Sequence, residues 1–427
     1  MKVLIIGGGG REHALAWKVA QSPEVSQVYC APGNAGTALE SGVENVPIEA
    51  DAIADLVDFA RTESVELTIV GPEAPLVAGV VDVFTLAGLR CFGPRREAAE
   101  LEGSKAYMKS FLKRHAIPTA AFETFDDFDR ASAYIRSQPV PIVIKADGLA
   151  AGKGVVIAAD HDEAIEAARV MLSGDAFGAA GKRIVVEEFL TGEEVSFIVM
   201  TDGTNVVPFA SSQDHKARDD GDRGPNTGGM GAYTPAPIVD EKLHQRILDE
   251  VIAPTLAGMA ADGRPYQGFL YAGLMIGADG APKVLEYNCR FGDPETQPIM
   301  MRLRSDLATA CLALLEGRGD AVELDWDPRK ALGVVVASGG YPANYAKGKV
   351  ISGLETGAAP DTYVFHAGTT LDDNDRIVTS GGRVLCVVGL GDTVGEAQAR
   401  AYARVDEIAF DGAFCRRDIG YRAIARE

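Results

Sequence analysis

The chain has 427 residues, of which 47% are hydrophobic and 24% are charged. At roughly 100 to 200 residues per domain, this length excludes a single hydrophobic core and predicts several domains. The composition is that of a globular protein, and it argues against intrinsic disorder and against a membrane protein.

The formal net charge of −20 restricts the partners that the protein can bind. A strongly acidic surface repels nucleic acid and anionic lipid, so we expect neither as a partner and look instead for small anionic ligands held by local donors. The apolar run at residues 3–6 is too short for a signal peptide, and we expect a cytoplasmic protein. The six cysteines are scattered without CxxC pairs, which argues against a disulfide framework or a zinc site.

The first hundred residues alternate between short apolar runs and helix-prone segments. The second and third runs end in the turn residues APGN and GPE, which is typical of parallel strands with functional loops at their carboxyl ends. We therefore expect residues 1–103 to form an open parallel α/β sheet. The expected strands cover residues 3–6, 25–30, 67–70 and 89–92.

The pattern changes after Pro118, and we expect residues 104–326 to form a second unit with a small α+β lobe at about 119–192. The glycine-rich segment 221–235 has no hydrophobic period and predicts a long loop. A helix at about 240–260 and a hairpin-like strand pair at 268–277 and 282–290 follow. Residues 327–427 are strand-rich and predict a small α+β C-terminal domain.

The glycine turn at residues 7–10 lies between the first strand and the first helix, where backbone N–H groups can face an anion. It favours a small phosphate or carboxylate ligand. A purely structural turn and a dinucleotide site are the alternatives. The dinucleotide fingerprint is incomplete, because Glu12 stands where its third glycine would be and the second strand ends without an acidic residue.

A second glycine-rich segment, KADGLAAGKG, lies between two expected strands and contains Lys145, Gly148, Gly152, Lys153 and Gly154. A lysine at a strand end followed by a flexible glycine loop is typical of a cover over ATP phosphates. The segment is not a P-loop, because glycine stands where Ser or Thr is required. An ordinary hairpin with exposed lysines is the alternative.

Acidic residues cluster in RIVVEEFLTGEE, where backbone groups could meet an adenine edge and Glu193 could meet ribose hydroxyls. A solvated acidic edge explains such a run equally well. Asp214 and Lys216 precede the 221–235 segment and could address a polar substrate, whereas we assign His215 no role.

Strand alternation in KVLEYNCR places Glu286 and Asn288 on one face, where their oxygens suit Mg²⁺ bridging phosphates. Arg290 continues on that face and could stabilise a transferring phosphoryl group. The alternative is a strand with a structural ion pair.

These elements resemble, in their order, the ATP-grasp superfamily. The segments LEGSKA, KADGLAAGKGV, EEFLTGEE, GPNTGGMGAY, NCRFGDPETQ and CRRDIGYRA are similar to those of the phosphoribosylamine–glycine ligase family, and the resemblance extends along essentially the whole chain. It implies an α/β and α+β multidomain protein: an ATP-grasp fold preceded by an open parallel α/β domain and followed by a small strand-rich C-terminal domain.

The resemblance also implies an activity: ATP-dependent ligation of glycine to 5-phosphoribosylamine through glycyl phosphate, with Mg²⁺ or Mn²⁺, by an enzyme that we expect to be a monomer. The alternatives are another ATP-grasp carboxylate–amine ligase, an NAD-linked oxidoreductase and a non-catalytic nucleotide sensor.

Carried over residue by residue, the family pattern gives four groups of side chains and backbone positions. The implied catalytic residues are Arg290, Asp214 and Lys145, and the implied metal ligands are Glu286 and Asn288. The implied ATP-binding residues are Lys105, Lys145, Gly148, Gly152, Lys153, Gly154, Glu187, Glu188, Leu190 and Glu193. The implied substrate-binding residues are Gly9, Gly10, Glu73, Asp214, Lys216 and Arg290.

Overall fold

The N-terminal part of the chain is a parallel five-stranded sheet with the order β3-β2-β1-β4-β5. The computed structural model describes residues 1–149, 154–174, 182–355 and 361–427. The predicted open parallel sheet is confirmed. Its strands are β1 (Lys2–Gly7), β2 (Gln27–Pro32), β3 (Val43–Asn45), β4 (Leu67–Val70) and β5 (Cys91–Phe92), and its helices are α1 (Gly10–Ala20), α2 (Ala35–Leu39), α3 (Ile53–Thr62), α4 (Glu73–Ala78), α5 (Val80–Leu86) and α6 (Arg96–Gly103).

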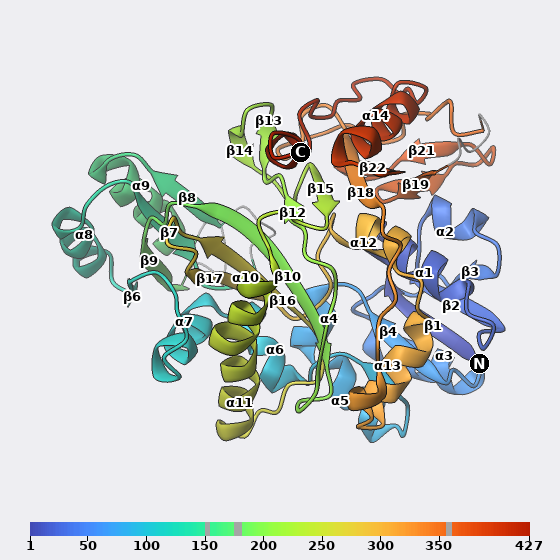
Figure 1. Cartoon of the computed structure of the whole chain (residues 1–427), viewed down its shortest axis with the longest axis horizontal. Coiled ribbons are helices and arrows are strands. Elements are labelled where there is room, and N and C mark those ends of the chain that lie inside the picture. The colour runs from blue at the N-terminus through green and yellow to red at the C-terminus, as the bar shows by residue number, and fades with distance from the viewer. Residues whose placement is uncertain (150–153, 175–181, 356–360) are drawn as a thin grey trace.

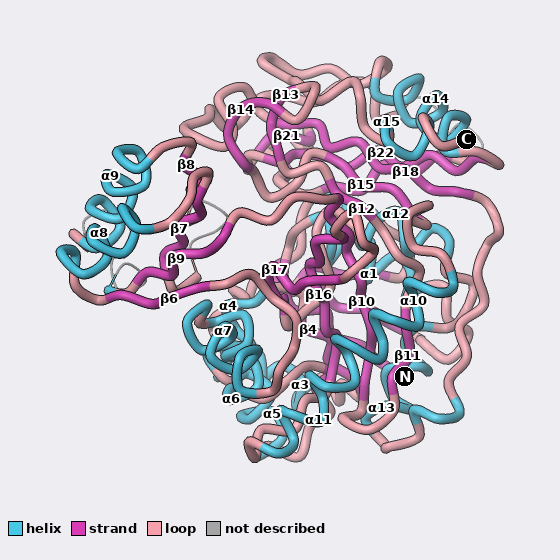
Figure 2. The backbone as a smooth tube through the Cα atoms, turned by 60° about the vertical axis from the view of Figure 1, so that its left-hand side comes forward, coloured by secondary structure: helices cyan, strands magenta, loops and turns pink. Residues whose placement is uncertain are grey.

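A small lobe follows α7 (Lys105–Arg114) and projects from the rest of the chain at the left of Figure 1. Its sheet is antiparallel with the order β6-β9-β7-β8, and two helices pack against that sheet around a separate apolar core. The tube in Figure 2 shows the same separation from a second direction. The lobe contains β6 (Phe122–Phe125), α8 (Phe128–Ser137), β7 (Ile142–Ala146), β8 (Val155–Ala158), α9 (His161–Leu172) and β9 (Ile184–Glu188).

The central sheet is antiparallel, with the order β11-β10-β16-β17, and the predicted strand pair is its β16-β17 hairpin. It shares core clusters with the N-terminal sheet, and the rings of Phe92 and Phe269 meet at 4.8 Å between their centroids. The elements are β10 (Glu193–Thr201), β11 (Val206–Pro208), β16 (Gly268–Ile276), β17 (Pro282–Asn288), α10 (Glu241–Ile247), a π-helical turn (Leu248–Ile252), α11 (Ala253–Ala261), α12 (Thr296–Arg302) and α13 (Leu307–Leu315).

The C-terminal sheet joins strands from distant parts of the sequence, in the order β12-β15-β18-β22-β19. Two of these strands come from the middle of the chain and three from its last hundred residues, and Figure 1 shows them together near the top. The strands are β12 (Gln213–Asp214), β15 (Gly231–Thr234), β18 (Lys330–Ala337), β19 (Thr362–His366) and β22 (Arg383–Gly391); a short 3₁₀ turn (Gly319–Ala321), the ribbon β20 (Thr369–Leu371) with β21 (Ile377–Thr379), α14 (Val394–Val405) and α15 (Tyr421–Ile424) complete this part.

The prediction of a loop at 221–235 was wrong, because this segment contains β15 and also β14 (Arg223–Asn226), which pairs with β13 (Ala217–Asp219). An added Cβ at Gly231 would lie 2.6 Å from the carbonyl oxygen of Gly333, so close strand pairing requires glycine here. The glycines that suggested a loop therefore allow a strand to pack. Among the described residues, no helix is long and apolar enough to cross a membrane.

Candidate functional site

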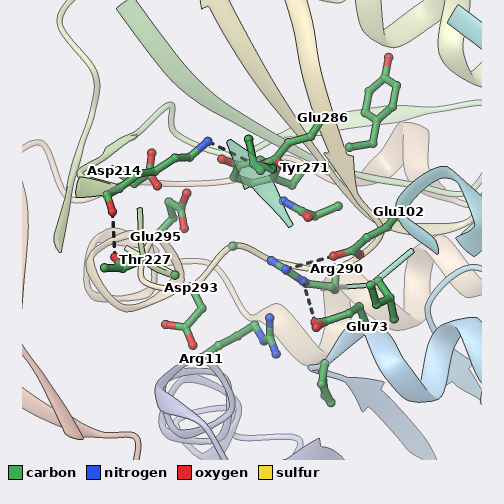
Figure 3. A pocket seen from close by; sticks show the side chains of 18 of the residues that line it. Arg11, Glu73, Glu102, Asp214, Thr227, Tyr271, Glu286, Arg290, Asp293 and Glu295 are labelled. Carbon is green, nitrogen blue, oxygen red and sulfur yellow. Dashed lines mark hydrogen bonds and ion pairs between the residues drawn. The ribbon is translucent and has the colours of Figure 1, made fainter. Parts of the chain in front are cut away.

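A cavity of about 450 Å³ lies where the three larger sheets and the small lobe meet (Figure 3). Every part of the fold contributes to its wall. The N-terminal part supplies Arg11, Glu73 and Glu102; α7 supplies Lys105; the lobe supplies Gly154 and Val155; the central sheet and the turn after it supply Tyr271, Glu286, Asn288, Arg290, Asp293 and Glu295; and the C-terminal sheet and its neighbours supply Asp214, Lys216, Tyr341 and Arg383.

Glu286 and Asn288 both line this cavity, on either side of the buried Tyr287. Glu286 accepts a hydrogen bond from Lys216 at 3.4 Å, and the positive charge of Lys216 lowers the pKa of Glu286 to about 2. The carboxylate therefore stays ionised at any working pH. An ionised carboxylate beside an amide oxygen is a donor set that suits Mg²⁺.

Arg290 is held between two carboxylates, as the dashed lines in Figure 3 show. Its guanidinium lies 3.4 Å from Glu73 and 3.1 Å from Glu102. Burial opposes the charge, but Glu102 and Glu73 outweigh it and raise the pKa of Arg290 above its usual value. Glu102 is itself buried and accepts the backbone N–H of Cys289 at 2.7 Å, which fixes the turn that carries Arg290.

Asp214 and Glu295 are two further carboxyl groups in the cavity wall. Burial raises the pKa of Asp214 to about 8, and burial also raises the pKa of Glu295. Within the described part of the chain neither makes an ion pair; Glu295 accepts a hydrogen bond from the Ser196 hydroxyl at 2.9 Å. Lys216, two residues after Asp214 in the sequence, forms ion pairs with Glu194 at 2.8 Å and with Glu286.

The N-terminal glycine turn encloses a carboxylate of the protein itself. Glu12 accepts the backbone N–H of Gly9 at 2.6 Å, and an added Cβ at Gly71 would lie 2.0 Å from the same carboxylate. Gly10 packs against Gln297. Gly9 also lines a second cavity of about 310 Å³, which shares Asp293, Tyr341 and Arg383 with the first.

Within the described residues, the predicted ATP-binding residues on α7 and in the lobe lie beside the first cavity or behind it. Lys105 lines it and donates to the Gly148 carbonyl at 3.0 Å. Gly152 and Lys153 fall outside the described residues. Behind the wall, Lys145 lies 3.1 Å from Glu187, and both are buried.

The remaining residues of the predicted adenine hinge have other partners. Glu188 is exposed and accepts the Ala121 N–H at 3.2 Å, whereas Leu190 is buried. Glu193 forms an ion pair with Arg426, and the hydrogen bond from Arg426 lowers the pKa of Glu193. His215, to which we assigned no role, is buried and accepts the Gly420 N–H at 3.1 Å; burial lowers the pKa of His215 to about 4, so it is neutral.

Comparison with known proteins accounts for this arrangement. Residues 1–102, 103–296 and 331–422 match the N domain, the ATP-grasp (A) domain and the C domain of phosphoribosylglycinamide synthetase. The chain belongs to the phosphoribosylglycinamide synthetase family. It is 65% identical to the phosphoribosylamine–glycine ligase of Allochromatium vinosum over the full length of both chains.

A solved structure of the family agrees with this membership, and a more distant structure shares the fold. The phosphoribosylamine–glycine ligase of Thermotoga maritima is 37% identical, with a TM-score of 0.85 and coverage of 98% of this chain and 100% of that one. The biotin carboxylase domain of Hydrogenobacter thermophilus 2-oxoglutarate carboxylase, solved with MgADP, has a TM-score of 0.74 at 15% identity, with coverage of 97% of this chain and 91% of that one. The latter likeness concerns the fold alone.

Several cavity residues of this family member were missed by sequence reasoning. Glu102 lies in LEGSKA and Glu295 in NCRFGDPETQ, two segments that carry the family resemblance, but neither side chain was singled out there. Arg383 lies in the segment SGGRVL. Arg383 donates to the Asp293 carbonyl at 2.7 Å and lies 3.2 Å from its carboxylate. No spacing rule reveals these contacts, because each joins segments far apart in the sequence. Glu12 is different, since Glu three residues after a helix N-cap is a capping signal.

Proposed function

We propose that the protein ligates glycine to 5-phosphoribosylamine and consumes ATP, giving glycinamide ribonucleotide, ADP and phosphate in purine biosynthesis. The observation that carries the proposal is that Glu286, Asn288, Lys105, Arg290 and Asp214 line one cavity in a chain of this family. That cavity combines a metal donor set, cations for phosphates and a carboxyl group for an amine.

The reaction requires activation of a carboxylate, which is a poor electrophile. A glycine carboxylate oxygen attacks the γ-phosphorus of ATP, the bond to the β,γ-bridging oxygen breaks, and ADP leaves. The amine of phosphoribosylamine then attacks the carbonyl carbon of glycyl phosphate, phosphate leaves, and a proton is lost from nitrogen. Glu286 and Asn288 would hold Mg²⁺ or Mn²⁺, which supplies charge neutralisation at the phosphates.

Cationic side chains carry the remaining phosphate charge in this proposal. Lys105 and Lys145 would contact the nucleotide phosphates, and Arg290 would face the transferring group. Because Glu73 and Glu102 hold the guanidinium of Arg290 from two sides, its orientation is set before the substrates bind.

Asp214 would orient the amine and accept its proton. A pKa of about 8 lies near the operating pH, which is where a general base is most effective. Gly9, Gly10, Glu73 and Lys216 would contact the phosphoribosyl substrate.

We further propose that ATP lies between the small lobe and the central sheet. The loop with Gly148, Gly152, Lys153 and Gly154 would cover the phosphates. Glu187, Glu188 and Leu190 would lie at the adenine, and Glu193 at the ribose after release from Arg426.

Phosphate release from ATP, measured with each substrate omitted in turn, tests the function. We expect release only when glycine and freshly generated phosphoribosylamine are both present. Equal release with another carboxylate–amine pair would assign the chain to a different ATP-grasp ligation.

A further inference from the structure

A buried lysine that has no assigned role lies behind the cavity wall. Lys109 of α7 has no solvent exposure, and its ammonium lies 3.0 Å from a carboxylate oxygen of Glu187. Lys145 reaches the same oxygen at 3.1 Å. One carboxylate therefore serves two ammonium groups.

Further hydrogen bonds close these three side chains into a ring with β17. Lys109 donates to the Thr119 hydroxyl at 2.7 Å, and that hydroxyl donates to the Val284 carbonyl at 2.7 Å. At the other end, Lys145 donates to the Leu285 carbonyl at 3.3 Å. A break in the β16-β17 register leaves Leu285 unpaired, which frees its carbonyl for this bond.

The ring crosses the junction between the lobe and the rest of the chain. Lys145 and Glu187 belong to the neighbouring lobe strands β7 and β9, whereas Lys109 lies on α7 and the two carbonyls on β17. Rotation of the lobe about this junction would have to break at least one of these buried polar contacts, which is costly where water cannot replace them. The ring therefore fixes where Lys145 stands relative to β17 and its metal-ligating residues.

The charges of the ring are unequal, and the excess is positive. Without Lys109, the carboxylate of Glu187 would form an ion pair with Lys145 alone, and the two charges would cancel. Lys109 shares the carboxylate, so part of the charge of Lys145 is left for another anion. The ammonium of Lys145 lies 3.3 Å from the Leu285 carbonyl, one residue before Glu286 of the cavity wall.

We propose that Lys109 is a positioning residue, which holds Glu187 so that the ammonium of Lys145 remains directed at the nucleotide phosphates. The proposal rests on the assignment of Lys145 to ATP made above.

The test compares Lys109→Met with Lys113→Met in the full-length chain. Lys113 is a matched control, because it is exposed on the same helix. The ammonium groups of Lys113 and Lys109 each lie 5.8 Å from the centroid of the Phe122 ring. We expect Lys109→Met to raise the KM for ATP at least about tenfold, the size of a lost hydrogen bond to a charged group, with the KM for glycine unchanged. Indistinguishable variants, or an equal rise in both KM values, would refute the proposal.

A double variant tests whether Lys109 acts through Glu187. Glu187→Gln removes the shared charge, so adding Lys109→Met should raise the KM for ATP no further. A second, independent tenfold rise would overturn the proposal. If Lys109→Met does not fold, Thr119→Val removes the other partner of Lys109 and should raise only the KM for ATP; a wild-type value there would count against the idea.

Lys145→Met distinguishes the assignment of Lys145 to the nucleotide from the role of Lys109. Wild-type turnover and KM for ATP in this variant would remove the assignment of Lys145 to the nucleotide. Loss of ATP binding in Lys145→Met, together with wild-type behaviour of Lys109→Met, would remove only the role of Lys109.

Discussion

Replacement of Arg290 by Met removes the cation that Glu73 and Glu102 share. Both contacts are short, at 3.4 and 3.1 Å, and at an effective dielectric constant of about 20 each corresponds to about 5 kcal/mol of Coulomb attraction. The net loss is smaller, because the desolvation of the guanidinium is recovered; removal of one partner from a buried pair typically costs about 3 to 5 kcal/mol. We expect a loss of this size in the free energy of unfolding.

The loss of unfolding free energy in Arg290→Met should be larger at higher pH. Burial already raises the pKa of Glu102, and without Arg290 it rises further, so the folded state holds a proton that the unfolded chain has released. Such a group stabilises the protein below its unfolded pKa, and this contribution is lost as the pH rises through the folded pKa. Arg290→Met should therefore be more destabilised at pH 8 than at pH 5 when compared with the wild type.

Urea denaturation at the two pH values measures this difference, and Glu102→Gln is the matched control. That variant leaves Arg290 paired with Glu73, and its amide oxygen can still accept the Cys289 N–H, so its stability should change by only about 1 kcal/mol. Its kcat should nevertheless fall about tenfold or more, because the guanidinium loses one of its two restraints. An equal loss of stability for Arg290→Met at both pH values would refute the charge argument.

Three other variants or substrates test the remaining assignments. Glu286→Gln should lower kcat about a hundredfold with little change in the unfolding midpoint, and near-normal turnover would exclude Glu286 as a metal ligand. The pKa of Asp214 is raised to about 8, so its protonation contributes stability that is lost as the pH rises from about 4 to 8. Asp214→Asn should therefore be more stable than the wild type at pH 8. Urea titrations at pH 5 and pH 8 measure this difference, and no gain at pH 8 would contradict the raised pKa. Alanine should replace glycine with a kcat/KM about ten- to a hundredfold lower, since a methyl group must be forced into the glycine site, and equal use of both in a steady-state assay would exclude a glycine ligase.

Much of the fold could be predicted because its signals are local. The apolar runs before glycine turns gave the parallel sheet, and alternation placed Glu286 and Asn288 on one face. The strand β15 was missed because one of its two partners, β18, lies about a hundred residues further along the chain, and local sequence patterns do not reveal such a pairing. Lys109 was missed for a similar reason, since its partner Glu187 lies on β9, far from α7 in the sequence.

The C-terminal sheet affects the order in which the parts of the protein can fold during synthesis. Asp214 stands on β12, which pairs with β15, and β15 in turn pairs with β18. During synthesis the chain emerges N-terminus first, so β12 and β15 leave the ribosome about a hundred residues before β18 and still longer before β22. The parallel sheet and the small lobe can fold in that interval, but β15, which pairs with the strand that presents Asp214, still lacks its other partner β18. The side of the cavity that receives the amine is therefore completed only after β22 has emerged.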